Sequence, residues 1–344
     1  MDALTSLLAA TRALPSSARC QRIKSRIMAE PRVVDIHQAL LVTQSYQATA
    51  GQPAALRRAA AFRHCCEHLP IRIGADELIV GNRTPGVRSG VVFPEASVGW
   101  IDRELESLPT RPQDPFAVTA EQIATLRREV FPYWKGQTLE DTVYGRFDAE
   151  IMAAATVVKI NQRDHAQGHI IPDLSAWLRL GPAGLQAQAE AGSTLMHQSA
   201  AVSLAGARTF MRRYAEAARQ QIAGVTPERA SELADIAQRC HELADRPPRT
   251  FAEAVQATWF LFTLLHLESN ASSFSPGRLD QAWAPFLDAD LADGKLDRAQ
   301  YNAARRDLER ELLHDVGADQ DGNSGSRARG GRWAARAVRY AGRY

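Results

Sequence analysis

Residues 159–173 carry most of the side chains in this sequence whose types and spacing could do chemistry. The segment reads Lys159-Ile-Asn-Gln-Arg-Asp-His-Ala-Gln-Gly-His-Ile-Ile-Pro-Asp173 and contains two His, two Gln, one Arg and two Asp. Apolar sequence flanks it at residues 151–158 and 174–180. A polar segment between apolar ones is expected to reach into the interior of a fold, where each polar group needs a partner or a ligand.

Which of these side chains share a face depends on the backbone. In an extended segment, Arg163, His165, Gln167 and His169 lie on one face, because side chains alternate. In a helix, Arg163 pairs with Gln167, and His165 with His169, on different faces. Arg163 and Gln167 converge in both cases, and such a pair suits an anionic group with several oxygens.

Two alternatives compete with an anion site in this segment. His165, His169 and Asp173 would have metal-ligand spacing in a helix, but no Glu follows the first His, and Gly168 and Pro172 interrupt a helix. A hydrogen-bonded His pair is therefore preferred, and no metal site is predicted. The second alternative is structural: Arg163 pairs with Asp164 or Asp173 instead of a ligand.

Other candidate motifs are weaker. The arginines at 19–26 and the pair Arg57-Arg58 have the charge for phosphate, but without a Gly-rich loop they are interpreted as a solvated face. Dinucleotide, Walker A and Gly-x-Ser-x-Gly patterns are absent. The small polar residues at 268–275 directly follow an apolar helical stretch, so they are expected to line a buried cavity.

Composition narrows the class of protein. The 344 residues have a formal net charge of +2, which makes no case for nucleic acid or a membrane surface as a partner. The four cysteines have no C-x-x-C spacing, and this is typical of a reducing cytoplasm. No signal peptide or transmembrane run is present in the sequence, so a cytoplasmic location is predicted.

The elements that must position the polar segment are mostly helical. A Thr119-x-x-Gln122 capping box begins one of the helices, and Pro247-Pro248 precedes the most apolar one. Short strands are predicted at 71–80 and 91–94. Helices are predicted at 2–28, 33–50, 54–68, 118–133, 185–223, 227–244 and 250–267.

Six spaced blocks resemble the glycyl radical enzymes of the pyruvate formate-lyase and diol dehydratase superfamily. They are Glu77-Leu-Ile-Val-Gly81, Phe93-Pro-Glu95, Trp134-Lys-Gly136, Gly168-His169, the helix from Pro247-Pro248 to Glu268-Ser-Asn270, and Gly277-Arg-Leu-Asp-Gln281. The resemblance covers about residues 20–313. It implies an α/β, predominantly helical fold that forms the N-terminal half of a ten-stranded barrel surrounded by helices, in a family whose members are usually homodimers.

The resemblance also implies a chemistry and a set of site residues. Relatives use a protein glycyl radical, installed by a radical S-adenosylmethionine activating enzyme, that passes to a cysteine and then to a small-molecule substrate. Arg163 and Gln167 resemble the sulfonate grip of isethionate-type C–S lyases, and His169 matches a catalytic polar or base group of the dehydratases. Ser272-Ser273 falls where diol dehydratases have His-Ser, which weakens a glycerol or propanediol assignment.

The sequence departs from the family pattern in two motifs. It contains neither a Gly-Cys-x-Glu type motif for the thiyl cysteine nor an Arg-Val-Ala-Gly-Tyr type motif for the radical glycine. No bound cofactor is expected for this chain, and it is expected to be inactive alone. Residues 1–313 are predicted to be the N-terminal part of the family domain. Residues 314–344, rich in Arg and Gly, are predicted to be an unrelated disordered tail, as in a frameshifted or truncated reading frame.

These expectations lead to a ranked prediction of function. The full-length relative is predicted to be a radical lyase, with a sulfonate C–S lyase favoured, a diol or hydroxyproline-type dehydratase next and a formate acetyltransferase last. A different class stays open, in which the chain is a non-catalytic remnant or a pseudoenzyme that binds a partner. The predicted substrate contacts are Arg163, Gln167, Ser272 and Ser273, with His169 as the catalytic group.

Overall fold

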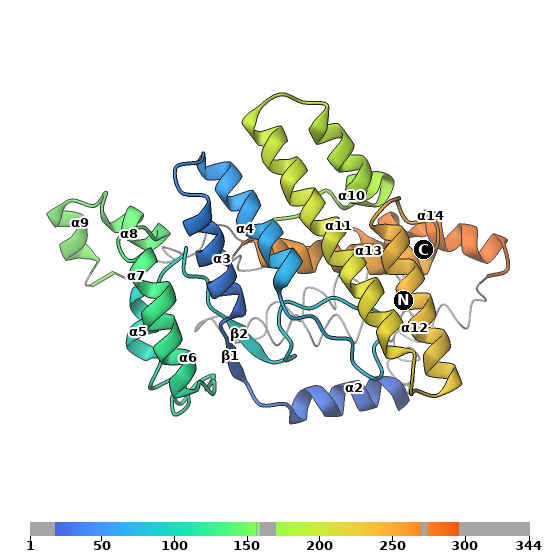
Figure 1. The fold of residues 1–344 in the computed structure, drawn as a ribbon, viewed down its shortest axis with the longest axis horizontal. Helices are drawn as coiled ribbons and strands as arrows, with labels where there is room; N and C mark the ends of the chain where they lie inside the picture. The colour runs from blue at the N-terminus through green and yellow to red at the C-terminus, as the bar shows by residue number, and fades with distance from the viewer. Residues whose placement is uncertain (1–17, 156, 159–169, 270–273, 296–344) are drawn as a thin grey trace, which may run out of the picture.

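A computed structural model describes residues 18–155, 157–158, 170–269 and 274–295. Their fold is rich in helices, with two short strands (Figure 1). The elements are, in chain order, α2 (Ala18–Ala29), β1 (Val33–Asp35), α3 (His37–Ala48), α4 (Ala54–His68), β2 (Ser89–Val91), α5 (Gly99–Glu104), α6 (Ala120–Thr125), the π-helix η1 (Leu126–Val130), α7 (Phe131–Trp134), α8 (Leu139–Tyr144), α9 (Ala149–Ala154), α10 (Leu174–Glu190), α11 (Leu195–Gln221), α12 (Pro227–Leu243), α13 (Phe251–Glu268) and α14 (Leu279–Ala292).

Threonine caps begin several of these helices where the sequence predicts them. Thr119 forms a full capping box with Gln122 at the start of α6, and Thr250 accepts a hydrogen bond from the Glu253 N–H at the start of α13. Thr226 caps α12 directly before Pro227. Because a capped N-terminus satisfies N–H groups that the helix cannot satisfy itself, local sequence suffices to place these helix starts.

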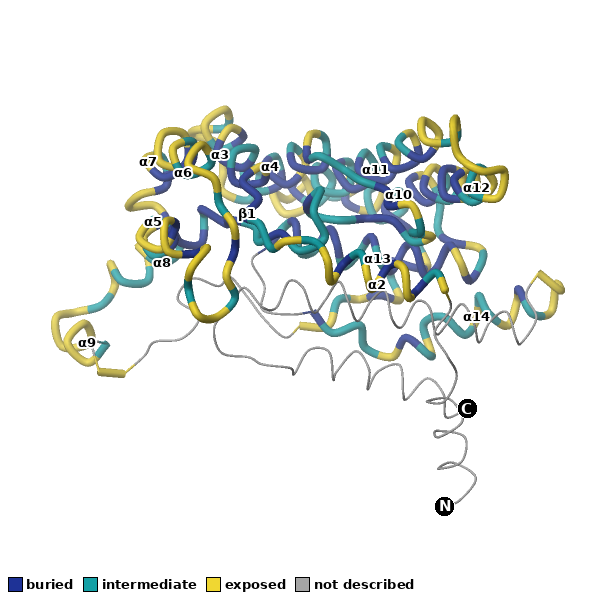
Figure 2. Tube along the Cα trace, turned by 90° about the horizontal axis from the view of Figure 1, so that it is seen from below, coloured by how far each residue is buried: buried dark blue, intermediate teal, exposed yellow. Residues whose placement is uncertain are grey.

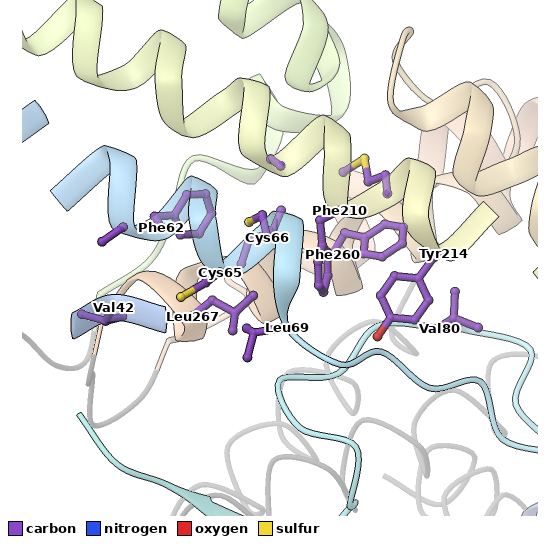
Figure 3. Packing of buried hydrophobic residues seen from close by; sticks show 14 of the residues in the cluster. Val42, Phe62, Cys65, Cys66, Leu69, Val80, Phe210, Tyr214, Phe260 and Leu267 are labelled. Carbon is purple, nitrogen blue, oxygen red and sulfur yellow. The ribbon is translucent and has the colours of Figure 1, made fainter. Parts of the chain in front are cut away.

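Helix α11 lies at the centre of the helical layer. It packs against α4, α10 and α12, and α3 packs against α4 on the far side (Figure 1). Helix α13 lies beneath this layer, where it contacts α4, α10, α12 and α14, and buried residues run along the layer and into α13 (Figure 2). In Figure 3 the side chains of Phe210, Tyr214 and Phe260 meet between α11 and α13, and these three residues are fully buried.

The predicted helix at 185–223 is two helices. The chain leaves α10 at Glu190 and begins α11 only at Leu195, where Thr194 provides the cap. Inside α10, Gly181 has a φ of 65° and is followed by Pro182, so the helix bends there. A Cβ at Gly181 would lie 3.1 Å from the backbone of Arg246 and Pro247, which explains why glycine occupies the bend.

The strand prediction is only partly right. β1 and β2 are parallel and pair Val33 with Ser89, and Val33 also bridges in parallel to Ala117. β2 overlaps the predicted strand at 91–94 by one residue, whereas β1 falls inside a predicted helix. This pairing joins positions more than fifty residues apart, so a local helical period could not reveal it. The barrel half and the boundary at 313 stay predictions, because residues 296–344 lie outside the described part.

The prediction of strands at 71–80 is wrong, and the reason lies in side chains. The backbone of this segment is satisfied by side chains from distant helices instead of by a neighbouring strand. The Gln256 amide accepts from Val80 N (2.9 Å) and donates to Val80 O (2.6 Å), while Arg229 donates to the carbonyls of Gly74 and Glu77 (2.9 Å each). These bonds take the groups that a sheet would otherwise need.

The interpretation of the 19–26 arginines as a solvated face is only partly right, because the Arg22 side chain is 58% exposed whereas those of Arg19 and Arg26 are 26% and 27% exposed. Arg19 forms an ion pair with Glu232 of α12, Arg22 with Asp76, and Arg26 with Glu77. The arginines therefore fasten α2 to the 71–80 segment and to α12, and they are occupied by protein carboxylates.

Replacement of Gln256 by Leu tests the role of the 71–80 anchor. Gln256 is fully buried, so Gln256→Leu leaves the Val80 N–H and C=O without a partner and should lower the free energy of unfolding by about 3 kcal/mol. Gln238→Leu, at an exposed position of α12, should change it by less than about 0.5 kcal/mol. Urea denaturation measures both; equal losses in the two variants would contradict this role of Gln256.

Candidate functional site

The five predicted site residues, Arg163, Gln167, His169, Ser272 and Ser273, lie outside the described residues. Residues 159–169 and 270–273 are not placed, so the structure tests neither their contacts nor the predicted metal absence at His165 and His169. The residues that border these two segments are placed, and they define the surroundings of the predicted site.

The two segments end on backbone that is paired. Ile170, which follows His169, forms a parallel bridge with Phe274, which follows Ser273. The Ser275 N–H donates to the Ile170 carbonyl at 2.9 Å, and the Phe274 ring lies 4.9 Å from the His266 ring of α13. The two segments, which are about a hundred residues apart in the sequence, therefore both lead directly into the same parallel bridge.

The flanks of the 159–169 segment behave differently from each other. Downstream, Leu174, Trp177 and Leu178 are buried on α10, as expected. Upstream, Val157 and Val158 are 87% and 65% exposed, so the residues just before the segment lie at the surface. The expectation that the polar segment itself reaches the interior stays a prediction, because residues 159–169 lie outside the described residues. Residues 149–154 form the short helix α9, which has no buried residue.

Asp173 has a structural role at the start of α10. Its Oδ1 accepts a hydrogen bond from the Ala176 N–H at 2.9 Å and caps the helix. A capping carboxylate is stabilised by the N-terminal N–H groups and the helix dipole, so Asp173 needs neither a metal nor an arginine to explain it.

On the other side of the predicted site, the end of α13 holds an ion pair. Arg58 of α4 donates from Nε to the Glu268 carboxylate and from Nη2 to the Glu268 carbonyl. Its neighbour Arg57 donates to the Tyr46 carbonyl (2.8 Å) and to the Tyr133 hydroxyl (2.7 Å). The prediction that Arg57-Arg58 is a solvated face is therefore wrong, because protein groups occupy both guanidinium groups.

Glu95 adds a second carboxylate to this region. Burial raises the pKa of Glu95; the nearby Arg58 lowers it in part, and Glu268 raises it further. Its Oε2 atom is buried and has no hydrogen-bond partner among the described residues. A carboxyl group whose pKa is shifted by desolvation next to a charge pair is a candidate for a functional group.

Two further buried oxygens lie at the same end of α13. Gln38 donates from Nε2 to the Leu267 carbonyl at 2.9 Å, and both its Oε1 and the Ser269 Oγ lack a partner among the described residues. Gln38 is 1% and Ser269 2% exposed. We call Gln38, Arg58, Glu95, Glu268 and Ser269 the α13-end cluster. Since buried polar atoms are nearly always paired, this cluster is suited to receive polar groups from elsewhere.

Sequence reasoning missed most of the α13-end cluster. Glu95 belongs to the block Phe93-Pro-Glu95, which carries part of the family resemblance but is assigned no role by it. The signal in the sequence is an acidic residue two positions after the apolar pair Val92-Phe93, which the structure buries. The polar run after the apolar helix did point to Glu268 and Ser269, although not to their partners on α3 and α4.

The four cysteines give no candidate for a reactive thiol. All are free and buried, and burial raises the pKa of Cys65, Cys66 and Cys240 well above its usual range. Cys65 and Cys66 pack into the core beside Phe62 and Leu69 (Figure 3). This environment keeps a thiol protonated and inert as a nucleophile.

Comparison with known proteins identifies the family. The family model described as pyruvate formate lyase-like matches residues 11–305. The chain belongs to the pyruvate formate lyase-like family. A probable dehydratase YbiW of Escherichia coli is 34% identical over 266 residues, and an isethionate sulfite-lyase of Oleidesulfovibrio alaskensis is 29% identical over 292 residues. The alignments cover 72% and 77% of this chain, but only 33% and 35% of those proteins.

Solved structures of pyruvate formate lyase-like proteins share the fold. The glycerol-bound B12-independent glycerol dehydratase of Clostridium butyricum matches with a TM-score of 0.82 and 30% identity, over 88% of this chain and 40% of that one. A glycyl radical enzyme of Archaeoglobus fulgidus matches with a TM-score of 0.80 and 27% identity. The chain thus spans about a third of the length of the curated relatives it matches, and these neighbours are glycyl radical enzymes. In the described part of this family member, no helix is long and apolar enough to cross a membrane.

Glu95→Gln tests the electrostatics of the α13-end cluster. The pKa of Glu95 is higher in the folded state than in the unfolded state. At a pH between these two pKa values, the folded state therefore binds more protons than the unfolded state, and the free energy of unfolding falls as the pH rises. Removing the charge should therefore raise the free energy of unfolding at pH 8 by about 1 kcal/mol, the scale of an incompletely paired buried group, with a smaller gain at pH 4.5. The exposed Glu150→Gln is the control; urea unfolding at both pH values measures the difference, and equal effects of the two variants would contradict this electrostatic role of Glu95.

Proposed function

We propose that this chain provides the substrate-binding part of a glycyl radical lyase that cleaves a C–S or C–O bond of a small, oxygen-rich substrate. The observation that carries the proposal is the parallel bridge between Ile170 and Phe274. It joins the ends of the two segments that hold the predicted substrate contacts, so both segments can serve one site. The family assignment supplies the class of chemistry.

A sulfonate C–S lyase is the favoured activity. Arg163 presents five donors in a fixed fork and Gln167 adds an amide, which together suit a sulfonate. Isethionate sulfite-lyases and a (2S)-3-sulfopropanediol dehydratase are among the relatives, and both names contain a sulfonate substrate. Ser272 and Ser273 would bond the substrate hydroxyl, and His169 would hold or move its proton.

A dehydratase of a diol or of hydroxyproline is the second candidate. It is supported by the 34% identity to the probable dehydratase and by the likeness to glycerol and hydroxyproline dehydratases. Ser272, in place of the histidine that diol dehydratases carry, argues against glycerol or propanediol. A formate acetyltransferase is the third and least supported candidate.

In this proposal, none of the residues of this chain carries the radical. A thiyl radical would take a hydrogen atom from the substrate, and the hydrogen would return from the thiol after the adjacent heteroatom group leaves. The sequence lacks the Gly-Cys-x-Glu and Arg-Val-Ala-Gly-Tyr type motifs, and its own cysteines are buried in the core. A radical S-adenosylmethionine activating enzyme and a second copy of the protein are the partners that the proposal includes.

Binding measurements test the proposed contact of Arg163 and Gln167 with a sulfonate. Titration calorimetry of the full chain with 2-hydroxyethanesulfonate and with glycerol should show preference for the sulfonate. Arg163→Lys keeps the charge but loses the bidentate contact, so it should weaken sulfonate binding by about 1–3 kcal/mol without lowering the melting temperature.

Arg179→Lys, at an exposed position of α10, should leave binding unchanged. A variant Arg163→Lys with unaltered preference, but a lower melting temperature, would instead show that Arg163 forms a structural ion pair with Asp164 or Asp173.

In the proposal this chain binds the substrate but carries no radical, and this can be tested by activity and by spectroscopy. After anoxic incubation with a radical S-adenosylmethionine activating enzyme, this chain alone should show no turnover of sulfonate or diol, because it lacks both radical motifs. Electron paramagnetic resonance should detect no glycyl radical on it. Turnover above the level of the activating enzyme alone would contradict the absence of radical carriers.

A further inference from the structure

The end of α4 holds a second group of chemically active side chains, apart from the α13-end cluster. The sequence there is His64-Cys-Cys-Glu-His68. Side chains three and four residues apart in a helix lie on one face, so His64, Glu67 and His68 are neighbours. Cys65 and Cys66 lie on the opposite face and are fully buried in the core (Figure 3).

The three side chains are close enough to share one ion. One ligand atom from each of His64, Glu67 and His68 lies within 4.8 Å of the others, and the two imidazole centroids are 4.5 Å apart. Zinc bonds to nitrogen and oxygen are about 2.0–2.2 Å long, so donor atoms on one ion are about 3–4 Å apart. Small side-chain rotations bridge that difference, since His64 and Glu67 are partly exposed and His68 is exposed.

The surroundings leave room for further ligands. A hollow of about 450 Å³ lies between α3, α4 and α11, and both His64 and Glu67 line it. Water molecules in this hollow can complete the coordination of an ion held by three protein ligands, the arrangement of zinc sites with an open position.

The helix end favours a cation here, whereas the Arg63 guanidinium already pairs with Glu67 and partly offsets its charge. The group lies in the last turn of α4, where the carbonyl end of the helix dipole attracts positive charge. Arg63 donates from Nε to Glu67 Oε1 at 2.7 Å, which orients the carboxylate and leaves Oε2 as the ligand atom.

We propose that His64, Glu67 and His68 form a binding site for a divalent metal cation, and that the bound cation is Zn²⁺. Two imidazoles and one carboxylate match zinc and its neighbours Ni²⁺ and Cu²⁺, whereas Mg²⁺ and Ca²⁺ prefer oxygen ligands alone. The site is independent of the proposed lyase function, because it shares no residue with the predicted substrate contacts.

Calorimetric titration of the full chain with Zn²⁺ tests the site. The wild type should bind one equivalent at α4, and Co²⁺ in its place should give the visible absorption of a low-symmetry site. The double variant His64→Gln/His68→Gln should bind Zn²⁺ at least about tenfold more weakly than the wild type, because losing a direct ligand costs no less than losing a group that only orients a ligand. The Zn²⁺ affinity of Glu67→Gln should lie between those of the wild type and the double variant. Added Zn²⁺ should raise the melting temperature of the wild type more than that of the double variant.

Two control variants exclude other histidines. His241→Gln, exposed on α12, should bind like the wild type. His165→Gln/His169→Gln removes the other pair with i,i+4 spacing and should also leave the α4 equivalent in place. Absence of binding by the wild type, unchanged binding by the α4 double variant, or loss of the equivalent in His165→Gln/His169→Gln would each overturn the proposal.

Discussion

The helix α13 carries polar side chains into the core, and its position depends on the partners that they meet there. Gln256 is fully buried and holds both backbone groups of Val80. Glu253 is 8% exposed and forms a bidentate pair with Arg246 at 2.8 Å for both bonds. The Trp283 ring nitrogen donates to Thr258 at 3.0 Å. Since an unpaired polar group in the core costs about 1–3 kcal/mol, these partners fix the register of α13 against its neighbours.

The same constraint fixes the position of the candidate site. The C-terminal end of α13 presents Glu268 to Arg58 and the Leu267 carbonyl to Gln38, which ties it to α3 and α4. A few residues later, the chain re-enters the described part at Phe274 and pairs with Ile170. The described residues on the two sides of 270–273 are thus fixed by contacts of α13 before the gap and by the parallel bridge after it.

Local sequence predicts those parts of the fold whose interactions are local. Threonine caps and apolar periods place the starts of α6, α12 and α13 within two residues, because a cap and the first turn of its helix lie within four residues of each other. The segment 71–80 has the composition of strands, yet its partners are side chains about 150–180 residues away. The parallel pairing of β1 with β2 is equally hard to predict from the sequence. Turn residues and residue periodicity predict hairpins between neighbouring strands, but they do not identify a parallel partner that is distant along the chain.

For the site, the sequence predicts which segments contain the chemistry but not which buried groups surround them. Arg57 and Arg58 have the pattern of a solvated face, and only the tertiary contacts reveal that Tyr46, Tyr133 and Glu268 occupy them. The importance of Glu95 has a similar origin. A glutamate after a proline is unremarkable in the sequence, and its raised pKa comes from burial by elements that are distant along the chain.

The charge balance of the α13-end cluster bears on the kind of substrate. Two carboxylates and one guanidinium carry a net charge of −1 when Glu95 is ionised, and under the proposed function this charge would oppose an anionic substrate bound beside the cluster. Burial shifts Glu95 toward its neutral form, while Arg58 already compensates Glu268. Removal of solvent by a bound substrate would shift Glu95 further, because desolvation disfavours the charged carboxyl. Under the proposed function, an anionic substrate bound beside the cluster would therefore favour the protonated form of Glu95 more than a neutral diol would.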